Sequence, residues 1–187
     1  MAAHPIELVL PDEPPPIRLM NTTWLDRDGM FDALGGVADL RVFLAAIGTA
    51  APTDLGVDDV VAIRGLRGAL RVLAQTSGAA GDGCSALDTL NAALGLETAA
   101  VVLTTSPQGW TLRHVQQTSF SACLGSLAHA GAAALADRSR PLSVCHAPGC
   151  GLYFVRSHSR RRWCSPGCGD RVRAARYYKR HRGTVAR

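Results

Sequence analysis

Apolar residues recur with helical spacing through the first half of the chain. Between residues 32 and 47 they fall every three or four positions, at Leu34, Val37, Leu40, Leu44 and Ile47. A second run extends from Asp58 or Asp59, either of which suits a helix cap, to about residue 76, and a third covers residues 84–94. Residues three and four positions apart share one face of an α-helix, so the pattern predicts three amphipathic helices.

The second of these helices has two chemically different faces. Four apolar residues are expected to face a core, namely Val61, Leu66, Leu70 and Leu73. Three arginines fall on another face, namely Arg64, Arg67 and Arg71. Upstream, residues 17–24 are expected to open the same domain as a short strand or a short helix. The pattern therefore predicts a helical core.

The period of the pattern changes after residue 99. Residues 100–105 and 110–115 are rich in strand formers and flank a Ser-Pro-Gln-Gly turn, which predicts a β-hairpin. An Ala-rich stretch over residues 119–137 predicts a further helix. Its inward residues are expected to be Cys123, Leu127 and Leu135. This part of the chain is therefore expected to be mostly α with a small β-hairpin.

Charge is divided unevenly along the chain. Residues 1–140 carry 9 Lys or Arg and 14 Asp or Glu, whereas residues 141–187 carry 11 Lys or Arg and one acid, Asp170. The first part thus has a net charge of −5 and the second of +10. We expect a flexible Pro-rich leader over residues 1–16, a helical domain over residues 17–140 that folds by itself, and a basic module over residues 141–187. Such a module suits a polyanionic partner.

The sequence shows no run of about 18 uncharged apolar residues and no basic and apolar secretory signal at its N-terminus. We therefore expect no contact with a membrane and a cytoplasmic location, where thiols stay reduced. Four of the six cysteines cluster within 24 residues. In a reducing compartment such a cluster indicates metal binding rather than disulfides.

The four clustered cysteines form two short pairs separated by a loop of hairpin size. They are Cys145, Cys150, Cys164 and Cys168. Tetrahedral zinc takes four thiolates in such an arrangement, so the spacing predicts one structural Zn²⁺ per chain. An iron–sulfur cluster on the same cysteines is the rival interpretation. His146 and His158 lie nearby, but four thiols already complete a zinc site, so both are expected to be exposed.

The residues around the two pairs predict the local fold. Pro148, Gly149 and Gly151 favour a tight turn in the first pair. Residues 152–155 and 161–163 are expected to form a hairpin. Ser165 is a good helix N-cap and Pro166 suits the first helical position, which places Cys168 in the first turn. A turn, a hairpin and a helix that carries ligands at its N-terminus predict a C-terminal treble-clef-like zinc finger.

These motifs resemble the CGNR zinc-finger family of bacterial proteins. The resemblance covers residues 145–182, through Cys-x-x-Pro-x-Cys-Gly-x-x-Phe, Ser-Arg-Arg-Arg-Trp-Cys-Ser-x-x-Cys-Gly-Asp-Arg and Arg-x-x-x-Tyr-Tyr-x-Arg-His-Arg. In that family a helical ABATE domain precedes the finger, and residues 19–22, 66–71 and 90–94 are similar to its pattern. The resemblance implies a stress-induced transcription regulator or an RNA-binding protein. The signature has Asn where this chain has Asp170, which would repel a phosphate but can still brace the finger.

Arginines dominate the finger and its helix. The predicted nucleic-acid-binding residues are Arg160, Arg161, Arg162, Arg171, Arg173, Arg176, Lys179 and Arg180. Arg173, Arg176 and Arg180 share one helical face, while Cys168, Val172 and Ala175 are expected to face the zinc core. Tyr177 and Tyr178 lie between the cations, and arginine with tyrosine suits phosphate binding and base stacking. A solvated charge face, or docking onto the acidic domain, is the alternative.

Catalytic residues are not predicted anywhere in the chain. His114 and His129 lack a partner at a diagnostic spacing, and no Gly-rich phosphate loop follows a strand. We expect a DNA-binding transcription regulator whose helical domain senses a small-molecule ligand or forms a homodimer. The alternatives are an RNA-binding protein or RNA-processing or RNA-modifying enzyme that uses the finger to grip its substrate, and a protein–protein adaptor. The sequence leaves DNA and RNA undecided.

Overall fold

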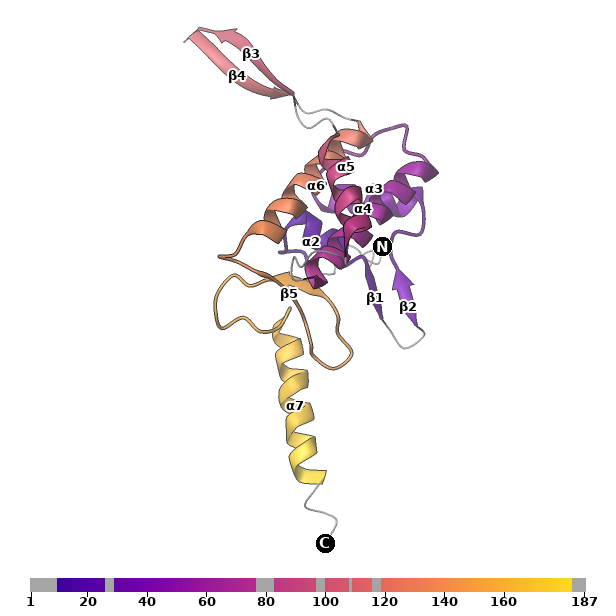
Figure 1. The fold of residues 1–187 in the computed structure, drawn as a ribbon, viewed down its shortest axis with the longest axis vertical. Helices are drawn as coiled ribbons and strands as arrows, with labels where there is room; N and C mark the ends of the chain where they lie inside the picture. The colour runs from indigo at the N-terminus through magenta and orange to yellow at the C-terminus, as the bar shows by residue number, and fades with distance from the viewer. Residues whose placement is uncertain are drawn as a thin grey trace.

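The computed structural model describes residues 10–25, 29–76, 83–96, 100–107, 109–115 and 119–182. Within these residues, five helices build the body of the molecule (Figure 1). They are α2 (Pro15–Met20), α3 (Val37–Ala46), α4 (Val57–Gln75), α5 (Cys84–Leu94) and α6 (Phe120–Ala136). The finger follows with strands β5 (Leu142–Val144) and β6 (Tyr153–Val155) and helix α7 (Pro166–Arg182).

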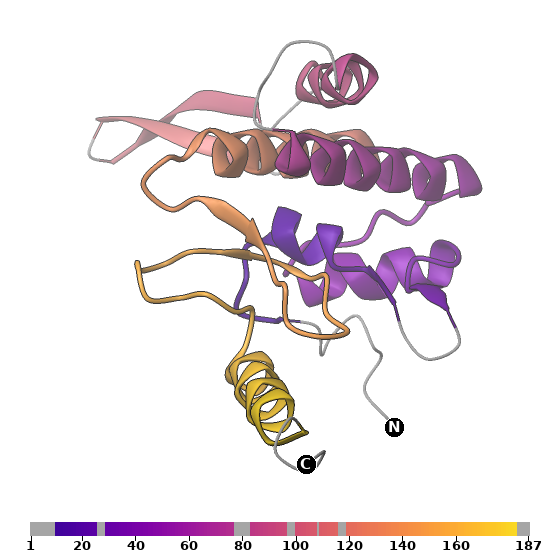
Figure 2. The same cartoon turned by 60° about the horizontal axis from the view of Figure 1, so that its bottom comes forward.

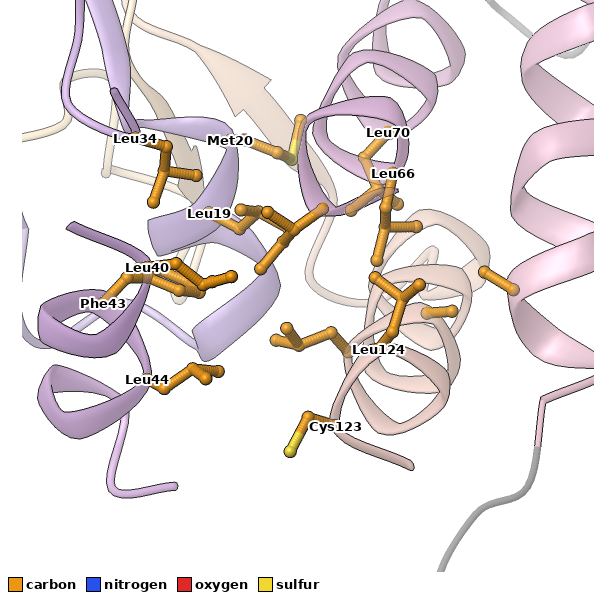
Figure 3. Close-up of a cluster of buried hydrophobic side chains, with 14 of the residues drawn as sticks. Leu19, Met20, Leu34, Leu40, Phe43, Leu44, Leu66, Leu70, Cys123 and Leu124 are labelled. Carbon is orange, nitrogen blue, oxygen red and sulfur yellow. The ribbon is translucent and has the colours of Figure 1, made fainter. Parts of the chain in front are cut away.

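Helix α4 is the centre of the body, because it contacts α2, α3, α5 and α6. Figure 2 shows α4 and α6 side by side, with α5 on one side of them and α2 on the other. Apolar side chains from α2, α3, α4 and α6 meet in the core between these layers (Figure 3). Among the helices that the structure describes, none has both the length and the apolarity that a membrane crossing demands.

The helix boundaries agree with the sequence at most ends and differ at the starts of α3 and α4. Helix α3 begins at Val37 rather than at Asp32, because Asp32 ends strand β2 (Met30–Asp32) and its carboxylate accepts the Leu34 amide at 2.9 Å. The expected helices over residues 84–94 and 119–137 are confirmed. Helix α4 starts earlier than expected, because its N-cap is Gly56 rather than Asp58 or Asp59; Asp59 lies in the first turn, where its carboxylate accepts the Gly56 amide at 2.8 Å.

The buried face of α4 differs from the predicted one. Val61 is exposed, and Val60 and Ile63 point into the core in its place. Arg67 is buried, where its guanidinium donates two hydrogen bonds to Asp32, at 2.6 and 2.7 Å. An arginine buried on the core side of a helix is stable only with such a partner, and Asp32 comes from a segment 35 residues upstream.

In the described part of the chain, three antiparallel hairpins accompany the helices, where the sequence predicted one in the body and one in the finger. The body contains β1 (Thr23–Leu25) paired with β2 (Met30–Asp32), and β3 (Ala100–Ser106) paired with β4 (Gly109–Val115). The β3–β4 pair is the predicted hairpin, and it extends from the end of the molecule opposite α7 (Figure 1). In the finger, β6 pairs with β5. The expected pairing of residues 152–155 with residues 161–163 is therefore wrong.

The finger and the body share packed residues. Tyr153 of β6 belongs to the apolar core of the body, whereas Phe154 points to the other side and packs around the cysteines. Consecutive strand residues face opposite ways, so β6 joins the two cores.

The expected flexible leader over residues 1–16 differs from the structure, because Glu13 is buried and helix α2 already begins at Pro15. Residues 1–9 of this expected leader lie outside the described part of the chain.

Candidate metal centre and nucleic-acid interface

The hairpin β5–β6 positions the first two cysteines. Cys145 follows β5 directly, and its amide extends the ladder by donating to the Leu152 carbonyl at 2.8 Å. The chain then turns back, with the Cys150 amide donating to the Ala147 carbonyl at 2.9 Å. Gly149 has a φ of +70°, a left-handed conformation that favours glycine. This tight turn brings the two thiols to one side of the hairpin.

The start of α7 supplies the other two cysteines. Cys164 precedes the helix and Cys168 lies in its first turn, where the amide of Cys168 donates to the Ser165 hydroxyl at 3.4 Å. Ser165 is thus the predicted N-cap. A Cβ atom on Gly169 would lie 3.2 Å from the Trp163 ring, so glycine there lets the tryptophan pack closely against the helix. The glycine of the Cys-Gly-Asp-Arg run therefore has a packing role.

The four thiols fit one metal ion. All four sulfurs lie within 4.8 Å of one another, with 3.7 Å between the Sγ atoms of Cys150 and Cys164 and 3.4 Å between those of Cys164 and Cys168. A zinc tetrahedron with Zn–S bonds of about 2.3 Å has sulfur–sulfur edges of about 3.8 Å. A cluster of several irons would hold its outer thiolates farther apart. The site is therefore that of one structural zinc, as the spacing predicted.

Crowding moves the pKa values of these thiols in opposite directions. The hydrogen bond with Cys164 lowers the pKa of Cys150 to about 5 and raises the pKa of Cys164 far above the usual thiol range. Burial raises the pKa of Cys145. Close, buried thiols resist joint ionisation unless a cation neutralises them, so zinc binding must displace protons from the site.

Surrounding groups support the charge of a tetrathiolate site. One Zn²⁺ with four thiolates has a net charge of −2. The Arg171 guanidinium donates to the Cys168 sulfur at 2.8 Å, and this bond raises the pKa of Arg171. The N-terminus of α7 adds its exposed amides and helix dipole. Phe154, Trp163 and Val172 pack around the cysteines and limit the access of water.

The histidines that the sequence analysis considered are exposed wherever the structure describes their side chains. His146 and His158 are exposed, and the metal-ligand cluster found in the described residues contains cysteines alone. His129 is exposed on α6. The side chain of His114 is outside the described part. Cys84 is exposed on α5, and Cys123 is buried in the body, remote in sequence from the zinc site.

The predicted nucleic-acid-binding residues fall into two groups. Arg161 is mostly enclosed: it donates to Glu13 at 2.6 Å and to the carbonyls of Val155 and Cys164 at 3.0 Å. Arg171 contacts the zinc-site sulfur. Arg171 is nevertheless exposed, as are the remaining six, namely Arg160, Arg162, Arg173, Arg176, Lys179 and Arg180.

Helix α7 leaves the finger after its second turn. Val172 is the last of its residues to be buried, and residues 173–181 are all exposed, Ala175 included, although that residue was expected to face the zinc core. Figures 1 and 2 show the helix extending away from the body. Asp170 pairs with Arg173, so the acid that replaces the signature's Asn braces a neighbouring side chain.

Two residues that hold the finger on the body escaped the sequence interpretation. Glu13 lay in the expected leader, where nothing pointed to burial. Asn21 lies in residues 19–22, which resemble the ABATE pattern, and this resemblance was the sequence signal that could have pointed to it. Asn21 is fully buried and hydrogen-bonds the backbone of Tyr153 on both sides of that residue's Cα.

Two family models match the chain, one for each part. Residues 13–138 match the ABATE model, described as "Putative stress-induced transcription regulator", and residues 141–181 match the CGNR zinc finger. No curated protein sequence matches the chain significantly. The ABATE match covers more than half of the chain, and the cysteine geometry agrees with the finger match. The chain therefore belongs to the ABATE family and carries a C-terminal CGNR zinc finger.

Proposed function

We propose that α7 binds nucleic acid and that the protein is a regulator that acts by binding, not an enzyme. The observation that carries this proposal is the exposure of the whole helix beyond Val172. A surface helix normally packs an apolar face on its domain, and this one has no such face over its last turns. Its side chains are therefore exposed on all sides, where a partner can reach them.

The charge of the exposed helix suits a polyanion. Arg173, Arg176, Lys179 and Arg180 lie within about a third of the helix circumference, given 100° per residue. Like charges three and four positions apart disfavour a helix by a few tenths of a kcal/mol per pair. A row of phosphates would remove this repulsion. Arg160 and Arg162, in the loop before α7, extend the cationic surface toward the finger.

The dimensions favour duplex DNA as the first partner to test. Residues 173–182 of α7 extend for about 15 Å at 1.5 Å per residue. An α-helix with side chains is about 10–12 Å wide and enters a B-DNA major groove of about 12 Å. The major groove of A-form RNA is too narrow for such a helix. Because α7 extends away from the body, the body would not block this approach.

Aromatic residues on α7 support RNA or single-stranded DNA as the second candidate. The rings of Tyr177 and His181 are stacked with 4.0 Å between their centroids. Tyr178 is two-thirds exposed. Aromatic faces beside arginines bind unpaired bases in many single-strand-binding proteins. An RNA-gripping role of the same helix would use this surface.

Two carboxylates outside the finger have lowered pKa values. The pKa of Asp32 is lowered although burial acts to raise it, because hydrogen bonds from Arg67 and the Leu34 amide and the charge of Arg67 dominate. The pKa of Asp137 is lowered to about 2 by hydrogen bonds from Ser139. These shifts have structural causes, an ion pair and a turn.

The body would supply regulation. A hollow of about 540 Å³ lies between α4 and α5 and is lined by small residues, Gly68 and Ala86 among them. It offers space for a small-molecule ligand.

The β1–β2 hairpin offers a surface for a homodimer through its exposed apolar residues Leu25, Met30 and Phe31. A regulator of this kind acts in the cytoplasm.

The test compares two doubly substituted full-length proteins that each lose two exposed cations. Arg176→Ala with Lys179→Ala removes charge from α7, and Arg138→Ala with Arg140→Ala removes it from the end of the body. Binding of the zinc-loaded proteins to duplex DNA, single-stranded DNA and RNA is measured over a range of salt concentrations. Alanine favours the helix, so the α7 variant keeps its fold.

The logarithm of the binding constant falls as the logarithm of the salt concentration rises. The α7 substitutions should make this fall less steep, by about 1.8 in slope on duplex DNA or about 1.4 on single strands. The body substitutions should leave the slope unchanged. The polymer that binds most tightly identifies the partner class. If no polymer shows salt-dependent binding to the unsubstituted protein, the proposal fails and the adaptor interpretation takes its place.

A further inference from the structure

The outer edge of strand β6 is completed by side chains instead of another strand. Strand β5 occupies one edge of β6, and the amides and carbonyls of Tyr153 and Val155 point to the other. The Asn21 side chain forms the two hydrogen bonds with the Tyr153 backbone that a neighbouring strand would otherwise form. It accepts from the Tyr153 amide at 2.7 Å and donates to the Tyr153 carbonyl at 2.9 Å.

Glu13 and Arg161 complete the second residue of this edge. The Val155 amide donates to the Glu13 carboxylate at 3.0 Å, and the Val155 carbonyl accepts from Arg161 at 3.0 Å. The two side chains also pair with each other at 2.6 Å, and the Glu13 side chain is only 4% exposed. All four outward backbone groups of Tyr153 and Val155 are therefore satisfied by side chains, two of which come from the body.

We infer that Asn21 is a positioning residue for the zinc site, and that the body holds the cysteine turn ready for the metal. The zinc-binding turn lies between β5 and β6, so the placement of β6 fixes where Cys150 emerges. A turn that is already ordered loses less conformational entropy when zinc binds. The contact spans 132 residues of sequence and joins the matched ABATE segment to the finger.

The effect must be reciprocal. If Asn21 raises the affinity for zinc, zinc binding must strengthen the contact between Asn21 and Tyr153 by the same free energy. Zinc would then stabilise the body as well as the finger. This inference does not depend on nucleic acid, because it concerns only the metal and the two parts of the chain.

The test uses Asn21→Asp in the full-length protein, with Asn91→Asp as its matched control. Aspartate has the size of asparagine and still accepts from the Tyr153 amide, but it cannot donate to the Tyr153 carbonyl. Asn91 lies exposed on α5. Zinc affinity is measured by competition with a chromogenic chelator, and the melting temperature is measured with and without zinc.

We expect Asn21→Asp to weaken zinc binding by roughly 10- to 100-fold, the usual effect of losing a supporting contact of a metal site. It should also reduce the rise in melting temperature that zinc produces, while Asn91→Asp changes neither. Equal zinc affinity in Asn21→Asp and the unsubstituted protein would overturn the inference, whatever the melting temperatures.

A second variant covers the case in which Asn21→Asp does not fold. Glu13→Gln keeps an acceptor for the Val155 amide but loses the charge that pairs with Arg161. It should weaken zinc binding by roughly threefold, since ion pairs with partial exposure contribute modestly. Unchanged zinc affinity in a folded Glu13→Gln protein would also count against a body that positions the zinc site.

Discussion

Two adjacent residues of β6 allow a sharp test of how the finger joins the body. Tyr153 and Phe154 are both only 1% exposed, but Tyr153 packs in the body and Phe154 packs around the cysteines. Tyr153→Ala and Phe154→Ala should therefore damage different parts of the same protein. The two variants remove side chains of similar size from one strand, so each serves as the control for the other.

The magnitude follows from the burial. Replacing a large buried aromatic side chain by Ala costs about 3–5 kcal/mol in unfolding free energy, and Tyr153 also loses its hydrogen bond from Gln75, worth about 1 kcal/mol. In a chain of this length each kcal/mol lowers the melting temperature by about 2–4 °C. Tyr153→Ala should thus lower the melting temperature of the helical circular-dichroism signal by about 8–24 °C. The backbone of residue 153 keeps its hydrogen bonds to Asn21, so the zinc affinity of the Tyr153→Ala protein should change little.

Phe154→Ala should show the opposite pattern. The cavity opens beside Cys145 and Cys164, so most of the 3–5 kcal/mol should appear as weaker zinc binding, by about two to three powers of ten. The main helical transition should move less than in Tyr153→Ala. Trp110→Ala, at a side chain that is 75% exposed, should change neither quantity. If Tyr153→Ala melts within about 2 °C of the unsubstituted protein, the body closes its core without the finger, and Tyr153 does not join the two parts.

Three further predictions concern the body and the helix. A chain that ends at Arg140 should keep its helical circular-dichroism spectrum but melt at a lower temperature than the full chain. The reason is that Asn21 loses its hydrogen-bond partner Tyr153 and the apolar core of the body loses the Tyr153 ring. An unchanged melting temperature would show that the stability of the body does not depend on the finger. The lowered pKa of Asp32 means that its ion pair stabilises the fold above its ordinary value of 3.8, and that this stability is lost as pH falls through the folded pKa. The difference in melting temperature between Asp32→Asn and the unsubstituted protein should therefore shrink below about pH 4, which a series of melts across pH would check. Asp170→Asn should strengthen nucleic-acid binding and steepen the salt slope by up to about 0.9 on duplex DNA, since it releases Arg173 from its acid; weaker binding would mean that Asp170 holds α7 in its binding position.

The sequence by itself determined the parts whose partners are close in the chain. The zinc ligands lie within 24 residues, and the turn at Gly149 and the cap at Ser165 are local features, so their spacing was enough to predict that the thiols meet. The same holds for the long helices and for the β3–β4 hairpin, because periodicity and turn residues act over a few positions. The cationic character of α7 follows from composition alone.

Only the tertiary structure decided which residues hold these parts together. Nothing local distinguishes Glu13 from an exposed acid in a leader, or Arg161 from its exposed neighbours Arg160 and Arg162, until the two meet across 148 residues of sequence. Asn21 gains its role in the same way, from a strand 132 residues later. By its sequence, strand β6 could pair either upstream or downstream; in the structure it pairs with β5, and the body side chains Asn21 and Glu13 occupy its other edge. Contacts of this range depend on where the packed helices bring the chain, and short patterns of residues do not encode that position.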